Sequence, residues 1–171
     1  MNSDTMIRYI SSLRDESKKD GPSNYKIGFT ASCFDLFHAG HYLMLKDAKN
    51  QCDFLVVALQ TDPTVDLEYR MKTERTPKNT PIQSLEEREI QLQGCRYIDY
   101  IVHYETEEEL LNLLQELQPD VRILGSDWNN KPFTGYKLEI PIHWHNRIHN
   151  YSTSNLRRRV AVAEIRESEN K

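Results

Sequence analysis

The stretch from Lys26 to Asn50 reads KIGFTASCFDLFHAGHYLMLKDAKN and predicts a strand, a turn and a helix in succession. Residues 26–31 read as a strand, and the segment to Asn50 reads as a helix that begins near Ala39 or Gly40. Backbone N–H groups at the start of a helix are unpaired, and the helix dipole favours an anion there. Gly40 carries no side chain that would keep a ligand from this backbone. The turn is therefore a candidate phosphate site.

The rest of the chain continues to alternate between predicted strands and predicted helices. The further strands are residues 53–59, 99–103, 121–124 and 140–144, and the further helices are residues 84–95, 107–117 and 153–166. Ser84 and Glu87 form a possible capping box at the start of one helix. We expect a single-domain α/β fold, with a Rossmann-like parallel five-stranded sheet flanked by helices and ligands at the carboxyl ends of the strands. Residues 61–81 include three prolines and predict a long functional loop.

Composition narrows the class of protein. The chain has 171 residues, of which 38% are hydrophobic and 28% charged, as in ordinary globular domains. A formal charge of −4 argues against general nucleic-acid binding, so an anionic ligand would need locally placed cations. No apolar run is long enough for a membrane span or a secretory signal, and we expect a cytoplasmic protein. Three widely separated cysteines predict neither a disulfide framework nor a thiolate zinc site.

Residues 1–24 predict a helical extension that precedes the main domain, residues 25–171. Met6, Ile7, Ile10 and Leu13 recur at helical spacing before the breaker Asp20-Gly21-Pro22. This apolar stripe could pack on its own domain or on a second copy of the chain, and the pattern does not choose between the two.

His38 and His41 add two imidazoles to the turn after the first strand. At a spacing of three residues, both can face one side and donate hydrogen bonds to phosphate oxygens as charge develops. Two partly buried turn histidines, or a zinc pair, would give the same spacing. No third metal ligand follows at a familiar distance, so we predict no metal site on the protein.

The segment from Cys33 to His41 resembles the His-x-Gly-His signature of the cytidylyltransferase-like nucleotidyltransferases, and the likeness extends over about Tyr25 to Val160. The resemblance implies that Cys33, Phe34 and Gly40 contact the nucleotide and that His38 and His41 stabilise the transition state. Ser32 departs from the glycine of many members, and its side chain could crowd the turn.

Two later stretches follow in the family's order and indicate nucleotide contacts. Arg88 and Arg96 belong to a segment similar to the family's central helix and next strand, and guanidinium groups suit bidentate phosphate binding. A solvated helix face is the alternative for both. Gly125-Ser126-Asp127-Trp128 is similar to the Gly-Asp-Asp-Trp of glycerol-3-phosphate cytidylyltransferases. It implies that Asp127 and Trp128 recognise the base, although a strand-end turn with a packing tryptophan would look alike.

The stretch Arg147-Ile148-His149-Asn150-Tyr151-Ser152-Thr153-Ser154 resembles the family's Arg-Thr-Glu-Gly-Ile-Ser-Thr-Thr signature. Ser152 or Thr153 can cap the last helix and donate to phosphate, and Arg147 can neutralise developing charge. His149 and Asn150 depart from the signature.

Lys72 falls where the family places a lysine on a mobile loop, which implies a contact with the α-phosphate. Arg70 and Arg75 of the same loop are further candidates, and a solvated charge cluster is the alternative.

A second group of histidines surrounds Trp144. His143 and His145 alternate on one face of a predicted strand, and His149 follows. The three could line an acceptor site or an interface, and metal binding is weakly signalled.

We therefore expect a cytidylyltransferase that transfers CMP from CTP to a small phosphorylated alcohol such as glycerol-3-phosphate and releases pyrophosphate. An anionic phosphate nucleophile needs no general base, so the protein has to position the reactants and neutralise charge, aided by Mg²⁺. Adenylyltransferases that act on a sugar phosphate or on FMN share the fold, and the loop from Lys72 to Arg88 resembles the heptose-phosphate group. A nonenzymatic nucleotide-binding module is a third reading. The resemblance also implies a homodimer.

Overall fold

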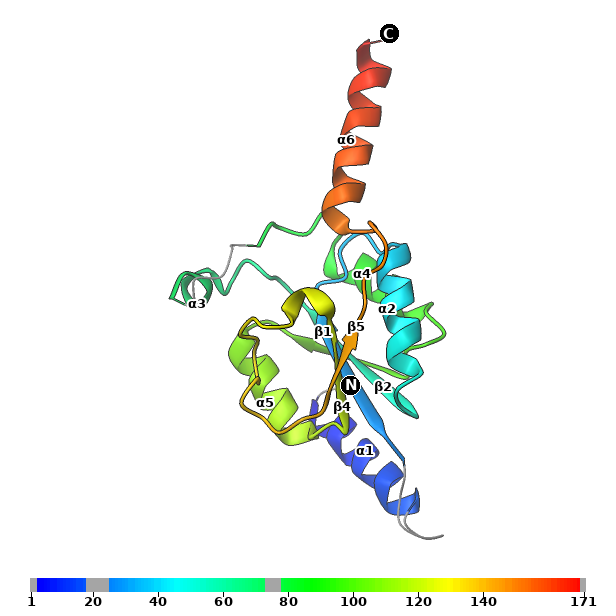
Figure 1. The fold of residues 1–171 in the computed structure, drawn as a ribbon, viewed down its shortest axis with the longest axis vertical. Coiled ribbons are helices and arrows are strands. Elements are labelled where there is room, and N and C mark those ends of the chain that lie inside the picture. The colour runs from blue at the N-terminus through cyan, green and yellow to red at the C-terminus, as the bar shows by residue number, and fades with distance from the viewer. Residues whose placement is uncertain (1–2, 18–24, 73–77, 170–171) are drawn as a thin grey trace.

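A computed structural model describes residues 3–17, 25–72 and 78–169, which form a five-stranded sheet with helices on both faces (Figure 1). The strands are β1 Ile27–Ser32, β2 Phe54–Gln60, β3 Tyr100–Tyr104, β4 Val121–Gly125 and β5 Ile142–His145. The helices are α1 Ser3–Ser17, α2 Ala39–Lys49, α3 Leu67–Lys72, α4 Leu85–Gln93, α5 Glu107–Leu117 and α6 Thr153–Glu169, with a 3₁₀ turn at Ser126–Trp128. The predicted Rossmann-like α/β fold is confirmed.

The sheet has the strand order β3-β2-β1-β4-β5, and every neighbouring pair is parallel. β2 is buried along its whole length, because both faces of a central parallel strand are covered by helices. The chain leaves β1 toward β2 on one side, whereas β4 lies on the other side. The carboxyl ends of β1 and β4 therefore flank the switch point at which such sheets bind ligands.

Two apolar layers cover the sheet. Phe54, Val56 and Ala58 of β2 pack with α1 and α5 on one face, and Leu55, Val57 and Leu59 pack with α2 and α4 on the other. The alternation follows from the two-residue period of a strand. A capping box joins Ser84 and Glu87 at the start of α4, as predicted.

The N-terminal helix α1 packs on the chain's own domain. Met6 and Ile10 are fully buried in the same apolar cluster as α5. Arg14 donates to the carbonyls of Leu117 and Gln118, which end α5. Of the two arrangements that the sequence leaves open, the structure shows packing of Met6 and Ile10 on the chain's own domain, so these two side chains are not available to a second copy.

Helix α3 lies inside the stretch that the sequence predicts as irregular. Its anchor is distant in sequence, since Arg70 pairs with Glu107 at 3.2 Å and a carboxylate oxygen of Asp66 accepts the N–H of Glu107 at 2.5 Å. Such contacts give no local signal in the sequence. Arg75 lies outside the described residues.

Helix α6 projects from the body of the molecule and carries the C-terminal end (Figure 1). In the described part of the chain, no helix is long and apolar enough to cross a membrane.

Candidate active site

The turn between β1 and α2 is held in an unusual backbone conformation. Phe34 and Leu36 have positive φ angles of 52° and 50°, a left-handed region that costs energy for side chains of this kind. Asp35 holds the turn in place, because its Oδ1 accepts the N–H groups of Ile82 and Gln83 at 2.9 and 3.0 Å. Such strain, fixed by surrounding contacts, is typical of functional sites.

His38 caps α2 with its side chain. Its Nδ1 accepts the N–H groups of Gly40 and His41 at 3.0 and 3.4 Å. These two amides are therefore not unpaired, contrary to the expectation that they are free to receive phosphate. Because Nδ1 is an acceptor, the proton of the neutral ring is on Nε2. Nε2 lies 3.4 Å from Oγ1 of Thr153, which donates to the carbonyl of Asp35.

His38 and His41 form a stacked pair, with ring centroids 3.9 Å apart. Burial lowers the pKa of His41 to about 3, with smaller contributions from His38 and Arg147. Burial, Arg147 and His149 lower the pKa of His38 as well. Both rings are therefore neutral donors at pH 7. A bound anion would offset the positive charge of Arg147 and raise both pKa values.

The first turn of α6 lies against the histidine turn. Ser152 accepts the N–H of Asn155 at 3.2 Å and so caps the helix, while Thr153 faces His38. Arg157 pairs with Asp35 at 3.4 Å. The two motifs that the sequence separates by more than a hundred residues thus meet at one edge of the sheet.

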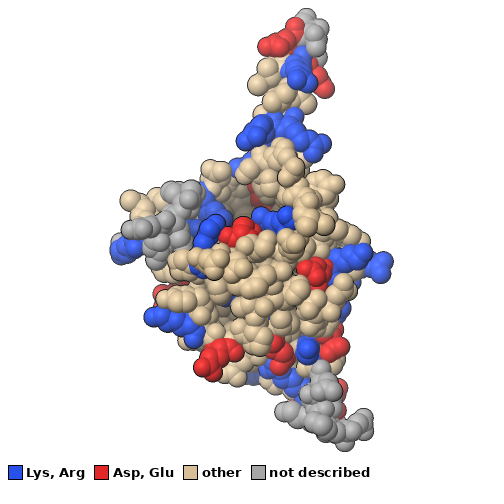
Figure 2. All heavy atoms as spheres, in the orientation of Figure 1, with Lys and Arg blue, Asp and Glu red and all other residues tan. Residues whose placement is uncertain are grey.

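Arg147 and Asp127 form an exposed ion pair at the same edge, with Nη1 and Oδ1 3.4 Å apart. An exposed pair of this kind contributes little stability, so both groups can exchange partners when a ligand arrives. Figure 2 shows Lys and Arg side chains gathered round a hollow at the foot of α6.

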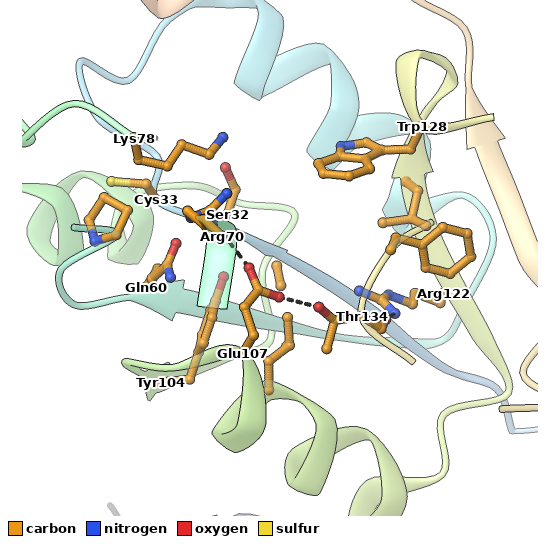
Figure 3. A pocket seen from close by; sticks show the side chains of 15 residues that line it. Ser32, Cys33, Gln60, Arg70, Lys78, Tyr104, Glu107, Arg122, Trp128 and Thr134 are labelled. Atoms are coloured by element: carbon orange, nitrogen blue, oxygen red, sulfur yellow. Dashed lines mark hydrogen bonds and ion pairs between the residues drawn. The ribbon is translucent and has the colours of Figure 1, made fainter. Parts of the chain in front are cut away.

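A small cavity of about 150 Å³, lined by both polar and apolar side chains, adjoins the turn at Ser32 and Cys33. Figure 3 shows Lys78 and Arg70 on one side of it and Trp128 and Arg122 on the other. The lining residues are Ala31, Ser32, Cys33, Gln60, Pro63, Arg70, Lys78, Tyr104, Glu107, Leu110, Arg122, Leu124, Trp128, Phe133 and Thr134.

Glu107 joins the two loops that border this cavity. Its carboxylate pairs with Arg70 at 3.2 Å and accepts a hydrogen bond from Thr134, whose carbonyl accepts from Arg122 (Figure 3). Arg70, Glu107, Arg122 and Thr134 are all buried. Lys78 is an exposed residue, but its ammonium group points into the cavity (Figure 3). Partial loss of water there and the charge of Arg70 lower the pKa of Lys78.

Sequence reasoning missed Lys78, Glu107 and Arg122 as site residues. Arg122 carried the clearest signal, because a charged residue inside a strand that is otherwise apolar requires a buried partner. Lys72 lies at the exposed end of α3, and it is not among the residues that line the cavity. Its contact with the α-phosphate stays a prediction.

Ser32 and Cys33 lie at the cavity wall, and Phe34 is buried against the edge of His41 at 5.2 Å between centroids. Ser32 is the last residue of β1 and pairs in register with Leu59. The backbone there is a regular strand, so a serine replaces glycine without strain. Direct nucleotide contacts by Cys33, Phe34 and Gly40 stay predictions.

Arg88 is buried and donates to backbone carbonyls. Its guanidinium reaches the carbonyls of Cys33 at 2.9 Å, Gln60 at 2.7 Å, Thr61 at 2.6 Å and Gln83 at 3.3 Å. These contacts tie the ends of β1 and β2 to the segment before α4, which indicates a positioning role.

Arg96 follows α4 immediately before β3, at the amino ends of the strands, while His38 and His41 lie at the carboxyl ends. Its guanidinium lies 5.4 Å from the ring centre of Tyr97. The expected location of Arg96 at the active edge is therefore wrong, because α4 runs antiparallel to the strands. We leave Arg96 out of the proposed site.

The second histidine group divides into two parts. His143 and His145 both bond to one carboxylate oxygen of Asp47, at 3.0 and 2.7 Å, and so fasten β5 to α2. His149 instead packs against Tyr151, with ring centroids 4.9 Å apart and planes tilted by 31°, and it contributes to the lowered pKa of His38. Only His149 of the three belongs to the surroundings of the histidine turn.

A site at the switch point between β1 and β4, with the stacked pair of His38 and His41 beside Arg147, is typical of the nucleotidyltransferase class of α/β proteins. The chain belongs to the cytidylyltransferase-like family, whose model matches residues 29–159.

Sequence relatives agree with this assignment, and one solved structure shares the fold. The bifunctional protein HldE of Campylobacter concisus is 33% identical over 139 residues, which are 81% of this chain and 28% of that protein. HldE of Wolinella succinogenes is 39% identical over 113 residues, 66% of this chain and 22% of that protein. The chain thus spans about a quarter of the length of these relatives. The crystal structure of a lipopolysaccharide core biosynthesis protein from Thermoplasma volcanium shares the fold, with a TM-score of 0.54 and 22% identity over 74% of this chain and 98% of that one.

Proposed function

We propose that this protein transfers a nucleotidyl group from a nucleoside triphosphate to a phosphorylated sugar. One observation carries the proposal: the neutral pair of His38 and His41 lies beside Arg147 and Thr153, next to a small cavity lined by cations. An oxygen of the acceptor phosphate would attack the α-phosphorus and form the new P–O bond. The bond from the α-phosphorus to the bridging oxygen would break, and pyrophosphate would leave with the electron pair.

The histidines suit the triphosphate side of this reaction. Neutral imidazoles can donate a hydrogen bond to the α-phosphate or to the leaving pyrophosphate, and Arg147 can leave Asp127 to neutralise charge. Asp127 would then be available to the base, as the family resemblance implies, with Trp128 as a wall. Both assignments are proposals.

The cavity suits the acceptor side. Its charged and polar side chains suit a phosphate group and hydroxyl groups. Lys78 and Arg70 offer cations to a phosphate, and Gln60 offers an amide to hydroxyl groups.

The comparisons favour the sugar-phosphate alternative over the first expectation of CTP and glycerol-3-phosphate. The matched relatives include proteins named HldE, and the loop from Lys72 to Arg88 resembles the heptose-phosphate group of adenylyltransferases. We therefore propose ATP as the donor.

Magnesium is also a proposal. Across residues 3–17, 25–72 and 78–169, no three His, Cys, Asp or Glu side chains gather where they could hold a metal ion. The protein side chains thus do not fit a resident metal site, and an ion would be held mainly by phosphate oxygens of the nucleotide. We also propose that the protein forms a homodimer and lies in the cytoplasm, as the sequence leads us to expect.

Pyrophosphate release by the purified chain tests the function. ATP and CTP would each be supplied with magnesium and paired with glycerol-3-phosphate, with a panel of hexose and heptose phosphates, or with FMN. We expect release with ATP and a sugar phosphate, and loss of release in His41→Ala. Faster release with CTP and glycerol-3-phosphate would instead support the cytidylyltransferase that the sequence analysis predicts. Nucleotide binding without turnover for any pair would favour a nonenzymatic module.

A further inference from the structure

Helix α6 lies outside the packed body of the molecule. No residue from Thr153 to Glu169 is buried, and every residue from Arg158 to Glu169 is exposed (Figure 1). Helices of this length are marginal in water when nothing packs against them, and most helical stability in proteins comes from tertiary contacts. A binding partner that packs against the exposed part of α6 would therefore stabilise this helix.

The charges of α6 run against the preference of an isolated helix. Arg157, Arg158 and Arg159 lie in the first half, whereas Glu164, Glu167 and Glu169 lie in the second half together with one cation, Arg166. The helix dipole favours acidic groups near the start and basic groups near the end. Figure 2 shows basic side chains near the foot of this helix and both acidic and basic side chains toward its tip. A neighbouring helix of opposite direction and the same sequence would place acidic groups beside basic ones at both ends.

One side of α6 has the spacing that such a neighbour needs. Arg158, Val162, Ile165 and Glu169 follow at intervals of four, three and four residues, so they form a single stripe along the helix. The stripe is roughly 16 Å long at the rise of an α-helix. Val162 and Ile165 are 41% and 56% exposed, although both are apolar. The spacing is the same in both directions along the helix. Two antiparallel copies of the stripe would therefore place a cation opposite an anion at each end and apolar side chains opposite each other in the middle.

We propose that α6 binds a second copy of this chain through an antiparallel helix pair. In this pair, Arg158 lies opposite Glu169 of the partner subunit, and Val162 lies opposite Ile165 of the partner subunit. A two-fold axis between Val162 and Ile165 makes the interface isologous, so each contact occurs twice. The proposal deepens the homodimer proposed above by naming its interface, and it does not depend on the proposed catalytic activity. Three helical turns bury little area, so we expect association in the micromolar range.

Sedimentation of the full chain over a range of micromolar concentrations tests the interface. We expect a reversible dimer, weakened about tenfold or more by Arg158→Glu and by Glu169→Arg, since each places like charges at both ends of the pair. Both substitutions improve the match to the helix dipole, so a loss of the dimer could not come from a loss of helix. An equimolar mixture of the two variants should associate again, because every end pair is then of opposite sign.

Two matched substitutions on the opposite face of α6 serve as controls. Glu164→Arg changes the same charge as Glu169→Arg, and Val160→Glu matches Val162→Glu, which we expect to be monomeric. Both control variants should remain dimeric. A monomeric wild-type chain throughout the concentration range would overturn the proposal. So would a dimer that survives Arg158→Glu, Glu169→Arg and Val162→Glu, because its interface would then lie elsewhere.

Discussion

Replacing Arg88 by methionine separates a positioning role from direct phosphate binding. The guanidinium donates to four backbone carbonyls at distances between 2.6 and 3.3 Å, and the residue is 2% exposed. Methionine fills a similar volume but donates nothing. The carbonyl of Gln60 would lose its donor in a buried position, and those of Cys33, Thr61 and Gln83 in partly buried ones.

The expected loss of stability follows from these contacts. A hydrogen bond from a charged donor contributes roughly 1.5–3 kcal/mol, but the contributions are not additive, and removing the guanidinium recovers part of the free energy spent on burying its charge. A buried carbonyl that loses its donor costs about 1–3 kcal/mol. We therefore expect Arg88→Met to lower the free energy of unfolding by about 4 kcal/mol, which is less than the sum over four carbonyls.

Urea unfolding followed by circular dichroism measures this change. Arg96→Met is the control, because Arg96 is exposed and its guanidinium contacts the ring of Tyr97, so its loss should lower stability by less than about 1 kcal/mol. A stability change below about 1 kcal/mol for Arg88→Met, with a large rise in KM for the nucleotide, would refute the reasoning and restore Arg88 as a phosphate ligand.

Further predictions concern the turn, the pH dependence and the cavity. In Gly40→Ala, the added methyl carbon would lie 2.9 Å from Cε1 of His38 and 3.0 Å from the carbonyl oxygen of Tyr151. Pyrophosphate release should therefore fall about tenfold or more while helix content is kept. Unchanged release would show that the turn has room for the methyl group. The pKa of His41 is lowered from 6.5 to about 3, so the unfolded chain binds the proton first, and the stabilisation from the neutral ring is complete above about pH 6.5 and declines toward pH 3. His41→Gln should flatten this decline in urea unfolding at neutral and acid pH, and an unaltered curve would contradict the assignment. Glu107→Gln removes the charge opposite Arg70, so KM for the acceptor should rise more than KM for the nucleotide in initial-rate assays; equal changes would count against the cavity as acceptor site.

Local sequence patterns predicted most of the fold. The span of α5, residues 107–117, was predicted as observed, because apolar residues at helical spacing begin just after a capping Thr106. The apolar run of residues 53–59 was predicted as a strand, and the structure buries β2 along its whole length. Helix α3 was missed, since Glu107, which holds it, lies far along the chain.

The residues of the candidate site also fall into two groups, those that sequence motifs could predict and those that they could not. His38, His41, Arg147 and Thr153 could be found from motifs, because each motif follows a strand and all strands end at one edge. Arg88 and Arg96 could not be distinguished by sequence, although the structure buries one among carbonyls and places the other at the opposite edge. Lys78 lies in a long loop. A loop has no periodic sequence pattern, so the sequence could not predict that Lys78 lines the cavity.

The central claim is that the neutral histidine pair stabilises charge as the nucleotidyl group is transferred. The most direct measurement is the single-turnover rate of pyrophosphate release by His41→Asn, beside nucleotide affinity from equilibrium dialysis. We predict that the rate falls by about 10²–10³-fold while affinity changes much less, because the donor acts on charge that develops in the transition state. A variant that stays folded and releases pyrophosphate at the wild-type rate would contradict the account.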